Sequence, residues 1–371
     1  ESCILPPQLG GPHQHTTYTE RALRSYAMLD SLFPDPKTKW LYTLAAMTLD
    51  RYPDGANPAH IVPFPVGEQM GFPRYPEVAS AVGAAHNSLV GGACLEDFTQ
   101  DGHLDIFVTS HGALDPVMLF LNDGQGGFQD QTEAAGLTGT IAGFNAVPAD
   151  FDNDGDMDIF VLRGAWLHDA GNLPNSLLVN QGDGTFVDRT RSAGLYSEHP
   201  TQNVVWFDLD RDGDLDLFIG NESGPDENHP CELFVNEGNG TFTERADELG
   251  IGQIRAYVKG SAAGDLNNDG WPDLYLSVLG GENLLFQNQQ GRFAAVGAEV
   301  SEPHYSFPCW FWDVNNDGWE DIFVSGYDLT DLDGVAGDYA AEMMGQGPSA
   351  ETPRLYLNRG DFRFEDVTEA Y

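Results

Sequence analysis

Residues 149–161, ADFDNDGDMDIFV, decide the fold, because they join an Asp-rich loop to an apolar, β-branched run. Four further stretches align with this one: EDFTQDGHLDIFV from Glu96, FDLDRDGDLDLFI from Phe207, GDLNNDGWPDLYL from Gly264 and WDVNNDGWEDIFV from Trp312. The first aspartates of the loops are spaced 48 to 58 residues apart: Asp97, Asp150, Asp208, Asp265 and Asp313. Repetition at such a period predicts a tandem array of one small structural unit.

A second shared element follows each loop: LFLNDGQGGFQDQT from Leu119, LLVNQGDGTFVDRT from Leu177, LFVNEGNGTFTERA from Leu233, LLFQNQQGRFAAVG from Leu284 and LYLNRGDFRFEDVT from Leu355. Its Asn-x-Gly-x-Gly turn is a hairpin signal, because Gly supplies positive φ angles. In the first repeat, four strands are predicted at residues 91–95, 105–109, 119–122 and 128–132. The pattern favours a mainly β fold, a β-propeller of four-stranded blades with five recognisable units, either complete or part of a larger propeller. A parallel β-helix would need far shorter repeats.

The N-terminal region has a different, helical periodicity. Residues 19–33 are predicted as one helix, ended by Pro34 and Pro36, and residues 38–51 as a second, broken at Pro53. In the first helix the apolar side chains are expected on one face: Ala22, Tyr26, Met28, Leu29 and Leu32. The predicted organisation is a segment 1–60 with a tetratricopeptide-like helical hairpin, a linker 61–72 and a calcium-binding propeller 73–371. The propeller repeats lie near 87–137, 141–195, 199–251, 255–300 and 304–371.

The loop pattern is typical of a calcium site, because Ca²⁺ prefers six to eight oxygen ligands on a flexible loop. Positions 1, 3 and 5 supply side-chain oxygens, Gly at position 6 permits a sharp turn, position 7 supplies a carbonyl and position 9 closes the cage. One ion is expected in each loop. The predicted ligand residues are Asp97, Thr99, Asp101, His103 and Asp105; Asp150, Asp152, Asp154, Asp156 and Asp158; Asp208, Asp210, Asp212, Asp214 and Asp216; Asp265, Asn267, Asp269, Trp271 and Asp273; Asp313, Asn315, Asp317, Trp319 and Asp321.

The loops differ from EF-hands at position 12, where an EF-hand needs a bidentate Glu. Apolar residues occupy that position in all five: Val108, Val161, Ile219, Leu276 and Val324. A strand–loop–strand site is therefore predicted. The first loop has Thr99 at position 3, a poorer ligand than Asp or Asn, so it is expected to bind most weakly.

Composition limits the classes of partner. The chain of 371 residues has 17 Lys and Arg against 58 Asp and Glu, a formal net charge of −41. Such a field repels nucleic acid and anionic membranes, and bound divalent ions would offset its self-repulsion. No apolar run is long enough to span a membrane. Four widely spaced cysteines leave two alternatives open, one or two disulfides or buried thiols: Cys3, Cys94, Cys231 and Cys309.

The repeats resemble the FG-GAP/VCBS class, to which the integrin α-subunit propellers belong, and more closely the bacterial relatives of cartilage acidic protein. The form GDxDNDGxxDLFV…LFxNxGDGTFxDVTxxAGL is matched nearly throughout by residues 150–195 and 208–251, and the resemblance covers about residues 73–371. It implies calcium at the loop aspartates and a propeller used in adhesion or ligand binding. Members often have seven blades and a further C-terminal domain.

Two features depart from this pattern. The sequence stops at Tyr371, after the fourth strand of its fifth unit, and no extra domain follows. Residues 72–79, FPRYPEVA, resemble the fourth strand of a blade but precede the first complete unit. This strand is expected to pair with strands from missing sequence or from a neighbouring molecule, because an unpaired strand edge recruits partners.

The preferred function is non-enzymatic binding, adhesion or structural assembly in an extracellular, cell-surface or periplasmic setting, with a protein or carbohydrate ligand. One alternative is a self-assembling filament or surface-layer subunit, and another is a polysaccharide lyase-like enzyme. The insertion at 327–353 is the preferred ligand or assembly surface, because long loops often carry binding functions. Trp271 and Trp319 share one loop position and are expected at the surface, whereas Trp206, Trp310 and Trp312 are expected in the core. The pair His13 and His15 is treated as incidental.

Overall fold

A computed structural model describes residues 16–63, 76, 78–86, 88–89, 91–297, 299–326, 344–345 and 351–370. The chain divides into two compact units, one of Tyr75–Gly326 with Thr352–Tyr371 and one of Glu1–Arg74 with Tyr327–Glu351. His13, His15, Cys3 and almost all of the insertion 327–353 lie outside the described residues. In the described part of the chain, no helix is both long and apolar enough to cross a membrane.

The larger unit consists of five four-stranded antiparallel sheets, which we number 1 to 5 in chain order. Sheets 1 to 3 contain β1 (Ala93–Glu96), β2 (Asp105–Val108), β3 (Met118–Asn122) and β4 (Phe128–Asp130); β5 (Asn145–Ala149), β6 (Asp158–Leu162), β7 (Ser176–Asn180) and β8 (Phe186–Asp188); β9 (Thr201–Phe207), β10 (Asp216–Asn221), β11 (Glu232–Asn236) and β12 (Phe242–Glu244). Sheets 4 and 5 contain β13 (Val258–Gly264), β14 (Asp273–Val278), β15 (Leu284–Asn288) and β16 (Phe293–Ala295); β17 (Ser306–Trp312), β18 (Asp321–Gly326), β19 (Arg354–Asn358) and β20 (Phe364–Asp366). The predicted mainly β fold of four-stranded units is confirmed.

The same register recurs across every Asp-rich loop. In each sheet the residue before the loop pairs with the residue at loop position 9: Glu96↔Asp105, Ala149↔Asp158, Phe207↔Asp216, Gly264↔Asp273 and Trp312↔Asp321. The loop is therefore the turn of a hairpin between first and second strands. The prediction of strand–loop–strand sites is confirmed, because position 12 lies inside the second strand of each sheet.

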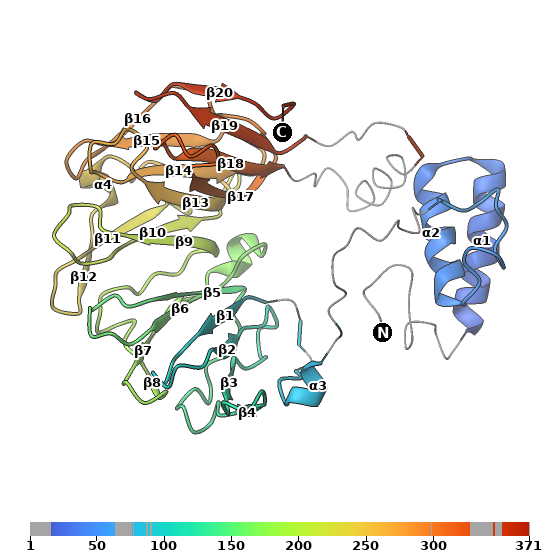
Figure 1. The fold of residues 1–371 in the computed structure, drawn as a ribbon, viewed down its shortest axis with the longest axis horizontal. Helices are drawn as coiled ribbons and strands as arrows, with labels where there is room; N and C mark the ends of the chain where they lie inside the picture. Colours follow the sequence, from blue (N-terminus) through green and yellow to red (C-terminus); the bar gives the residue numbers. More distant parts are fainter. Residues whose placement is uncertain are drawn as a thin grey trace. The chain divides into compact units, whose positions relative to one another are not determined.

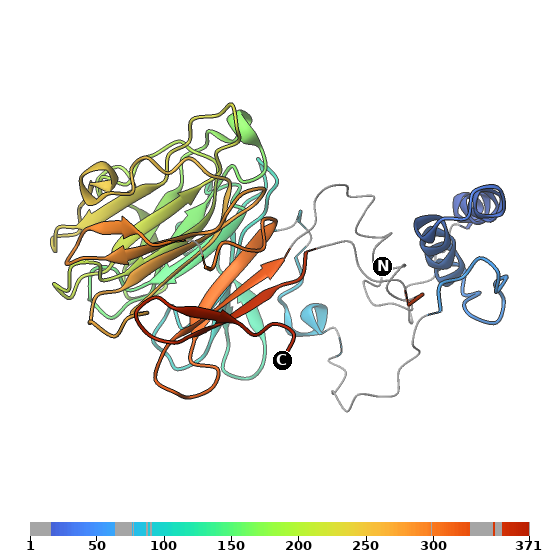
Figure 2. The ribbon, with the colours of Figure 1, turned by 90° about the horizontal axis from the view of Figure 1, so that it is seen from above.

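The five sheets follow one another around an arc (Figure 1), which Figure 2 shows from above with the sheets overlapping. Their first strands lie on the inner side of the arc and pack against each other in chain order, from β1 to β5, β9, β13 and β17. Four apolar cores fill the junctions between successive sheets. Within the described part of the chain, β17 does not pack on β1 in this way, so the arc is open.

Each junction is also closed by an asparagine at the end of a third strand. Asn236 Nδ2, for example, donates to Phe151 O of the preceding loop at 2.9 Å and to Leu215 O of its own loop at 3.1 Å. The same bond to a preceding loop is made by three other asparagines: Asn180 to Phe98 O, Asn288 to Leu209 O and Asn358 to Leu266 O. All four asparagine side chains are buried. Each sheet is thus hydrogen-bonded to the Asp-rich loop of the sheet before it.

The smaller unit contains two antiparallel helices, α1 (Thr17–Leu32) and α2 (Pro36–Thr48). Pro36 was expected to end the first helix, but it begins the second, because Pro lacks the N–H that a first helical position leaves unused. Asp35 caps α2 by accepting from Thr38 N at 2.9 Å. Residues Ile61 and Val62, predicted as linker, pack on the hairpin, and Val62 N donates to Thr43 Oγ1 at 2.8 Å.

The predicted apolar face of α1 is partly wrong. Leu23 is buried against α2, whereas Met28, Leu29 and Leu32 are exposed by 61%, 43% and 62%. The buried Asp30 explains the rotation of the helix. Its carboxylate lies 3.1 Å from Lys39 Nζ and 2.7 Å from His60 Nδ1, and it directs the stripe containing Leu23 toward α2.

A short helix, α3 (Ala79–Val82), occupies the end of the segment predicted as an extra strand at 72–79. The prediction is wrong at Ala79, and most of the segment lies outside the described residues. Gly83 follows α3 with φ +84°, and a Cβ there would lie 2.4 Å from Phe128 O. Gly136, Gly194 and Gly250 approach Phe186 O, Phe242 O and Phe293 O in the same way. Another α-helical turn, α4 (Ala246–Leu249), precedes Gly250.

The three described cysteines are buried free thiols, Cys94, Cys231 and Cys309. Burial raises the pKa of each thiol to about 12. Of the two alternatives, the buried-thiol interpretation holds for these three.

Replacing Asn236 by Ala should lower the free energy of unfolding by about 2–4 kcal/mol, because Phe151 O and Leu215 O lose their donor inside the fold. Denaturant unfolding monitored by circular dichroism measures this change. Asn122→Ala is the matched control at the same position of sheet 1, where the side chain donates only to Leu104 O among the described residues. Equal losses for the two variants would contradict a role of the asparagines between sheets.

Candidate metal-binding loops and a groove

All five Asp-rich loops share one backbone conformation. The glycines at position 6 have φ between +86° and +96°: Gly102, Gly155, Gly213, Gly270 and Gly318. The residues at position 4 are also left-handed, with φ between +55° and +66°: Gln100, Asn153, Arg211, Asn268 and Asn316. Side chains other than Gly adopt this region rarely, which explains Asn in three of the five places.

The carboxylate at position 1 organises the turn. Asp150 accepts from Asp154 N and Gly155 N, both at 3.1 Å. The same two bonds form in the other loops at Asp97, Asp208, Asp265 and Asp313. The carboxylate at position 5 then accepts from the N–H of position 7, as Asp154 does from Asp156 N at 2.9 Å. Carboxylate oxygens are therefore held around the loop interior by backbone donors.

The aspartate at position 9 begins the second strand of each sheet and is buried in all five: Asp105, Asp158, Asp216, Asp273 and Asp321. Asp216 shows contacts that Asp105, Asp273 and Asp321 share, whereas Asp158 accepts only from Asn180 N among the described residues. Asp216 Oδ1 accepts from Asn236 N and Asp216 Oδ2 from Leu209 N, both at 2.8 Å. One carboxylate therefore joins the loop to the third strand.

Burial of these carboxylates is electrostatically unfavourable. Burial, together with the neighbouring carboxylates of Asp152 and Asp154, raises the pKa of Asp158 to about 8. Burial likewise raises the pKa of Asp216 and Asp273 to about 7. A bound cation would reverse this effect, because an opposite charge favours the ionised form.

The second and third loops assemble the clearest donor sets for a cation. Carboxylate oxygens of Asp150, Asp152 and Asp158 lie within 4.8 Å of one another, and so do those of Asp208, Asp210 and Asp216. Two oxygens bound to one Ca²⁺ at 2.3–2.6 Å can be at most about 5 Å apart. Asp158 Oδ2 and Asp210 Oδ1 are buried and have no hydrogen-bond partner. These unsatisfied oxygens fit a metal ligand role.

The other three loops have a neutral residue at position 3. Thr99 Oγ1 is buried without a hydrogen-bond partner. Asn267 Oδ1 and Asn315 Oδ1 accept from Asp269 N and Asp317 N. At position 7 the His103 side chain is 44% exposed, which agrees with a residue that offers only its carbonyl.

Residue patterns did not reveal the function of position 4, which connects adjacent loops. Asn153 Nδ2 donates to Gly213 O at 3.2 Å and to Asp214 Oδ1 at 2.9 Å. Gln100 Nε2 reaches Gly155 O at 3.1 Å, and Asn268 Nδ2 reaches Gly318 O at 3.1 Å. Arg211 lies 5.4 Å from the Trp271 ring instead. The repeated positive φ is visible only in the structure, although Asn at a turn was a signal for it.

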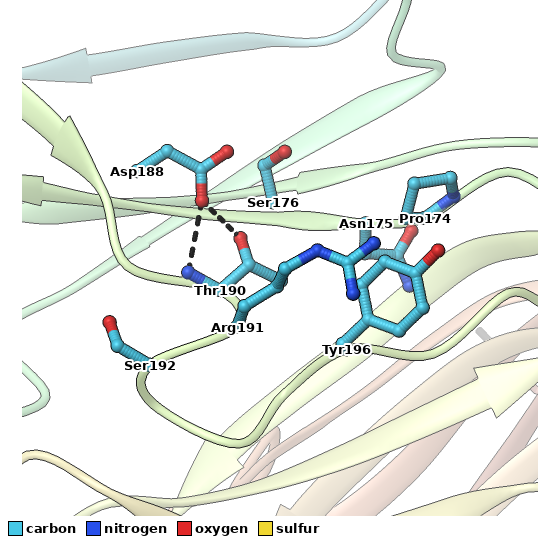
Figure 3. A pocket seen from close by; sticks show the side chains of 8 residues that line it. All are labelled: Pro174, Asn175, Ser176, Asp188, Thr190, Arg191, Ser192 and Tyr196. Atoms are coloured by element: carbon cyan, nitrogen blue, oxygen red, sulfur yellow. Dashed lines mark hydrogen bonds between the residues drawn. The ribbon is translucent and has the colours of Figure 1, made fainter.

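A groove lies at the other end of sheet 2. β6 leaves the acidic loop and β7 returns toward it, so the start of β7 is far from the loop aspartates. Here a cavity of about 440 Å³ is lined by Pro174, Asn175, Ser176, Asp188, Thr190, Arg191, Ser192 and Tyr196 (Figure 3). An adjoining cavity of about 330 Å³ shares Pro174, Ser176 and Asp188. We call the two together the sheet 2 groove.

The sheet 2 groove brings a cation, a carboxylate and an aromatic ring together. The Arg191 guanidinium carbon lies 3.5 Å from the centre of the Tyr196 ring (Figure 3). Asp188 accepts from Thr190 N and Oγ1 at 2.9 and 2.6 Å. Buried Arg163 forms part of the adjoining wall and donates to Ser176 Oγ at 2.8 Å. The groove therefore offers hydrogen-bond donors and acceptors beside an apolar ring.

Two histidines that are 30 residues apart in sequence meet in the larger unit. His229 Nδ1 lies 3.1 Å from His199 Nδ1, and His229 Nε2 lies 3.1 Å from Asp169 Oδ1. Asp169 belongs to the 3₁₀ helix η1 (His168–Gly171). His229 is buried and His199 is half-buried, whereas the Asp169 side chain is 77% exposed, so the cluster reaches the surface through its carboxylate. No local spacing signals this contact.

The expected placement of the tryptophans needs one correction. Trp310 was expected in the core, but it is 44% exposed, because it lies on the outer face of sheet 5, at one end of the arc. Its ring stacks on Phe323 at 4.5 Å and on Trp312 at 6.0 Å. Trp271 and Trp319 are half-buried.

With divalent ions removed by a chelator, the free energy of unfolding should fall as the pH rises from about 5 to about 8. The folded-state pKa values of about 8 for Asp158 and about 7 for Asp216 and Asp273 are raised. The unfolded chain releases these protons at lower pH, so the folded state binds more protons through this window and loses stability as they dissociate. Denaturant unfolding at each pH measures the slope.

Asp158→Asn should reduce this slope, whereas Asp226→Asn, at an exposed position outside the loops, is the matched control. If the free energy of unfolding in the chelator stayed constant across the pH range, the pKa values of the loop carboxylates would not be raised in the folded state.

Comparison with known proteins places the repeats in a family. The model of the FG-GAP-like repeat matches residues 97–161, 165–219, 223–276 and 265–324, more than half of the chain. Cartilage acidic protein 1 of Mus musculus is 31% identical over 144 residues, covering 36% of this chain and 21% of that protein. The Homo sapiens protein of that name is 34% identical over 113 residues, covering 30% and 16%. The alignments thus span about a fifth of the length of these relatives.

Among solved structures, the V. cholerae biofilm matrix protein Bap1 has a TM-score of 0.36 at 13% identity, covering 64% of this chain and 35% of that one. A putative exo-beta-1,3-galactanase from Bifidobacterium bifidum s17 has a TM-score of 0.39 at 10% identity, covering 76% and 91%. The repeat matches, the five sheets and the recurring loops agree with one another. The chain belongs to the FG-GAP-like repeat family.

Proposed function

We propose that this protein is a non-enzymatic, extracellular β-propeller protein in which calcium in the five loops stabilises a scaffold for ligand binding or adhesion. The observation that carries the proposal is the set of five buried aspartates at position 9. Each has further carboxylate or amide oxygens directed into the same loop, and three of the loops contain a buried oxygen without a partner at a predicted ligand position: Thr99 Oγ1, Asp158 Oδ2 and Asp210 Oδ1. A structure with this many buried acids needs compensating cations.

Calcium is the cation that fits best. The donors are oxygens from carboxylates, amides and carbonyls, on loops whose Gly allows a sharp turn. Zinc and other transition metals favour nitrogen and sulfur ligands, and no His or Cys side chain belongs to the proposed ligand set, because His103 supplies its carbonyl. An extracellular location supplies calcium at the millimolar level that weak modular sites use, with Kd of about 10⁻⁴–10⁻³ M.

Adding Ca²⁺ to the chelated protein should raise the Tm. Each site would contribute about 2.7 kcal/mol at a free ion concentration of 100 Kd, because the ion binds only the folded state. Differential scanning calorimetry measures the shift, and calorimetric titration counts the ions. Asp210→Asn should weaken one site, whereas Asp226→Asn should not. A melting curve unaffected by both calcium and chelator would reject the proposal.

We assign ligand binding to the sheet 2 groove, which lies away from the loops. Its donors and acceptors, together with the Tyr196 ring, suit a hydroxyl-rich ligand such as a saccharide, because sugars combine apolar faces with directional hydrogen bonds. The formal charge of −41 opposes nucleic acid as a ligand. Within such an acidic chain, Arg191 is a local point of attraction for a carboxylate on the ligand.

Arg191→Ala should weaken saccharide binding by about tenfold or more, because a charge-assisted hydrogen bond contributes about 1.5–3 kcal/mol. Calorimetric titration with a panel of neutral and uronic acid-containing oligosaccharides measures this. Arg189→Ala is the matched control, an exposed arginine two residues away. Calcium-dependent Tm should stay the same in both variants. If the panel binds equally well to Arg191→Ala, the ligand surface lies elsewhere.

A further inference from the structure

The asparagine contacts between sheets stop at sheet 1. Asn180, Asn236, Asn288 and Asn358 each donate to the carbonyl at loop position 2 of the sheet before, and all are buried. Asn122 holds the same place in sheet 1 but is only half-buried, and in the described residues its Nδ2 reaches only Leu104 O of its own loop, at 3.0 Å. The donor that would contact a preceding sheet is thus unused.

The matching acceptor is unused at the other end of the arc. The four residues at position 2 whose carbonyls accept from an asparagine are at most 2% exposed: Phe98, Phe151, Leu209 and Leu266. Val314, at position 2 of the fifth loop, is half-buried, and no side chain in the described part of the structure donates to its carbonyl. Asn316 at position 4 likewise has no recorded contact with a further loop in that part.

The apolar faces of the second strands show the same one-sided gap at sheet 1. Ile106 and Val108 are half-buried, whereas the residues at the same two positions of the other sheets are fully buried: Ile159, Val161, Leu217, Ile219, Leu274, Leu276, Ile322 and Val324. Leu95 and Leu104 on this face are 59% and 57% exposed. Large apolar faces of this kind are typical of interaction sites.

Sheet 5 has the complementary gap on its other face. The aromatic residue two positions after the buried aspartate is fully buried in four sheets: Phe107, Phe160, Phe218 and Tyr275. Phe323 holds this position in sheet 5 but is half-buried, and it stacks on the exposed Trp310. The two open faces are therefore the two halves of the interface that joins every interior pair of sheets.

A turn of the preceding sheet is already in place on sheet 1. Gly83 after α3 approaches Phe128 O as Gly136, Gly194 and Gly250 approach the fourth strand of the next sheet. In those cases the glycine ends the turn that leaves the sheet before. The position of α3 is therefore that of a turn belonging to a sheet located before sheet 1.

We propose that the open faces of sheets 1 and 5 bind one further sheet of the same repeat type, with Asn122 Nδ2 donating to its loop carbonyl. The third-strand asparagine of the added sheet donates to Val314 O, and the apolar faces of that sheet cover Ile106, Val108 and Phe323. A second copy of this chain fits less well. If sheet 5 of a second copy packed on sheet 1, the turn after its fourth strand, residues 368–370, would clash with α3, which already occupies that place.

An extended chain tests this proposal. A copy of residues 250–288 is joined after Tyr371, where it continues the register, because Phe364 corresponds to Phe242 and Tyr371 to Leu249. The extension should raise the Tm in calcium, protect the β1 and β2 amides from hydrogen exchange and shift tryptophan emission to the blue as Trp310 is covered. A scrambled extension of equal length is the control.

Asn122→Ala supplies the specific readout. In the extended chain it should lower the folding equilibrium constant by about tenfold, and in the original chain by clearly less. Asn236→Ala should have the same effect in both chains. If the extended chain with Asn122→Ala does not fold, Leu95→Asn allows the same comparison between the extended and the original chain. Leu95 is exposed in the original chain and would be covered by the added sheet.

Three results would overturn the proposal. The first is an equal effect of Asn122→Ala in both chains, and the second is an unchanged Tm with the native extension. The third is reversible dimerisation of the original chain that Trp310→Ser abolishes, since the occupant would then be a second copy.

Discussion

The buried aspartate at the start of each second strand is the constraint on which the larger unit depends. It sits where the Asp-rich loop enters the sheet. In four of the five sheets its two oxygens accept from backbone N–H groups of the loop and of the third strand, as Asp216 does from Leu209 and Asn236. The same burial that makes these hydrogen bonds strong also makes the charge unfavourable. Burial of this aspartate therefore both fixes the local geometry and makes a nearby cation favourable. A loop that holds the strands together also has the carboxylates that a cation would bind.

Coupling between sheets follows from that arrangement. The third-strand asparagine joins a loop to the sheet after it, and the residue at position 4 joins neighbouring loops, as Asn153 joins Gly213. Each sheet thus depends chiefly on its two neighbours, as in other repeat proteins. If an ion binds in one loop, it is expected to influence the adjacent junctions, because the same backbone segment contains the proposed metal-ligand carbonyl and an acceptor for the next sheet. The end sheets lack one neighbour each, and their apolar faces are open for that reason.

The two ends of each sheet have different chemistry. The loop end concentrates carboxylates, while the start of the third strand in sheet 2 brings together Arg191, Tyr196 and hydroxyl groups. A scaffold with its proposed ion sites at one end could vary the other end without disturbing its own stability. This separation is the physical basis for assigning stabilisation to the loops and recognition to the groove.

Sequence alone determined the repeats, the four strands of each unit and the strand–loop–strand form of the acidic loops. These features depend on residues close together in the chain, where periodicity and turn chemistry act directly. Only the tertiary structure decided which face of α1 is buried, because Asp30 reaches Lys39 and His60 on other elements. It also decided the exposure of Trp310, the contacts of the third-strand asparagines and the meeting of His199 with His229. Each of these depends on which elements become neighbours, and sequence spacing carries no information about that. The five loops were evident from their residues, but the way each loop joins one sheet to the next emerged only in three dimensions.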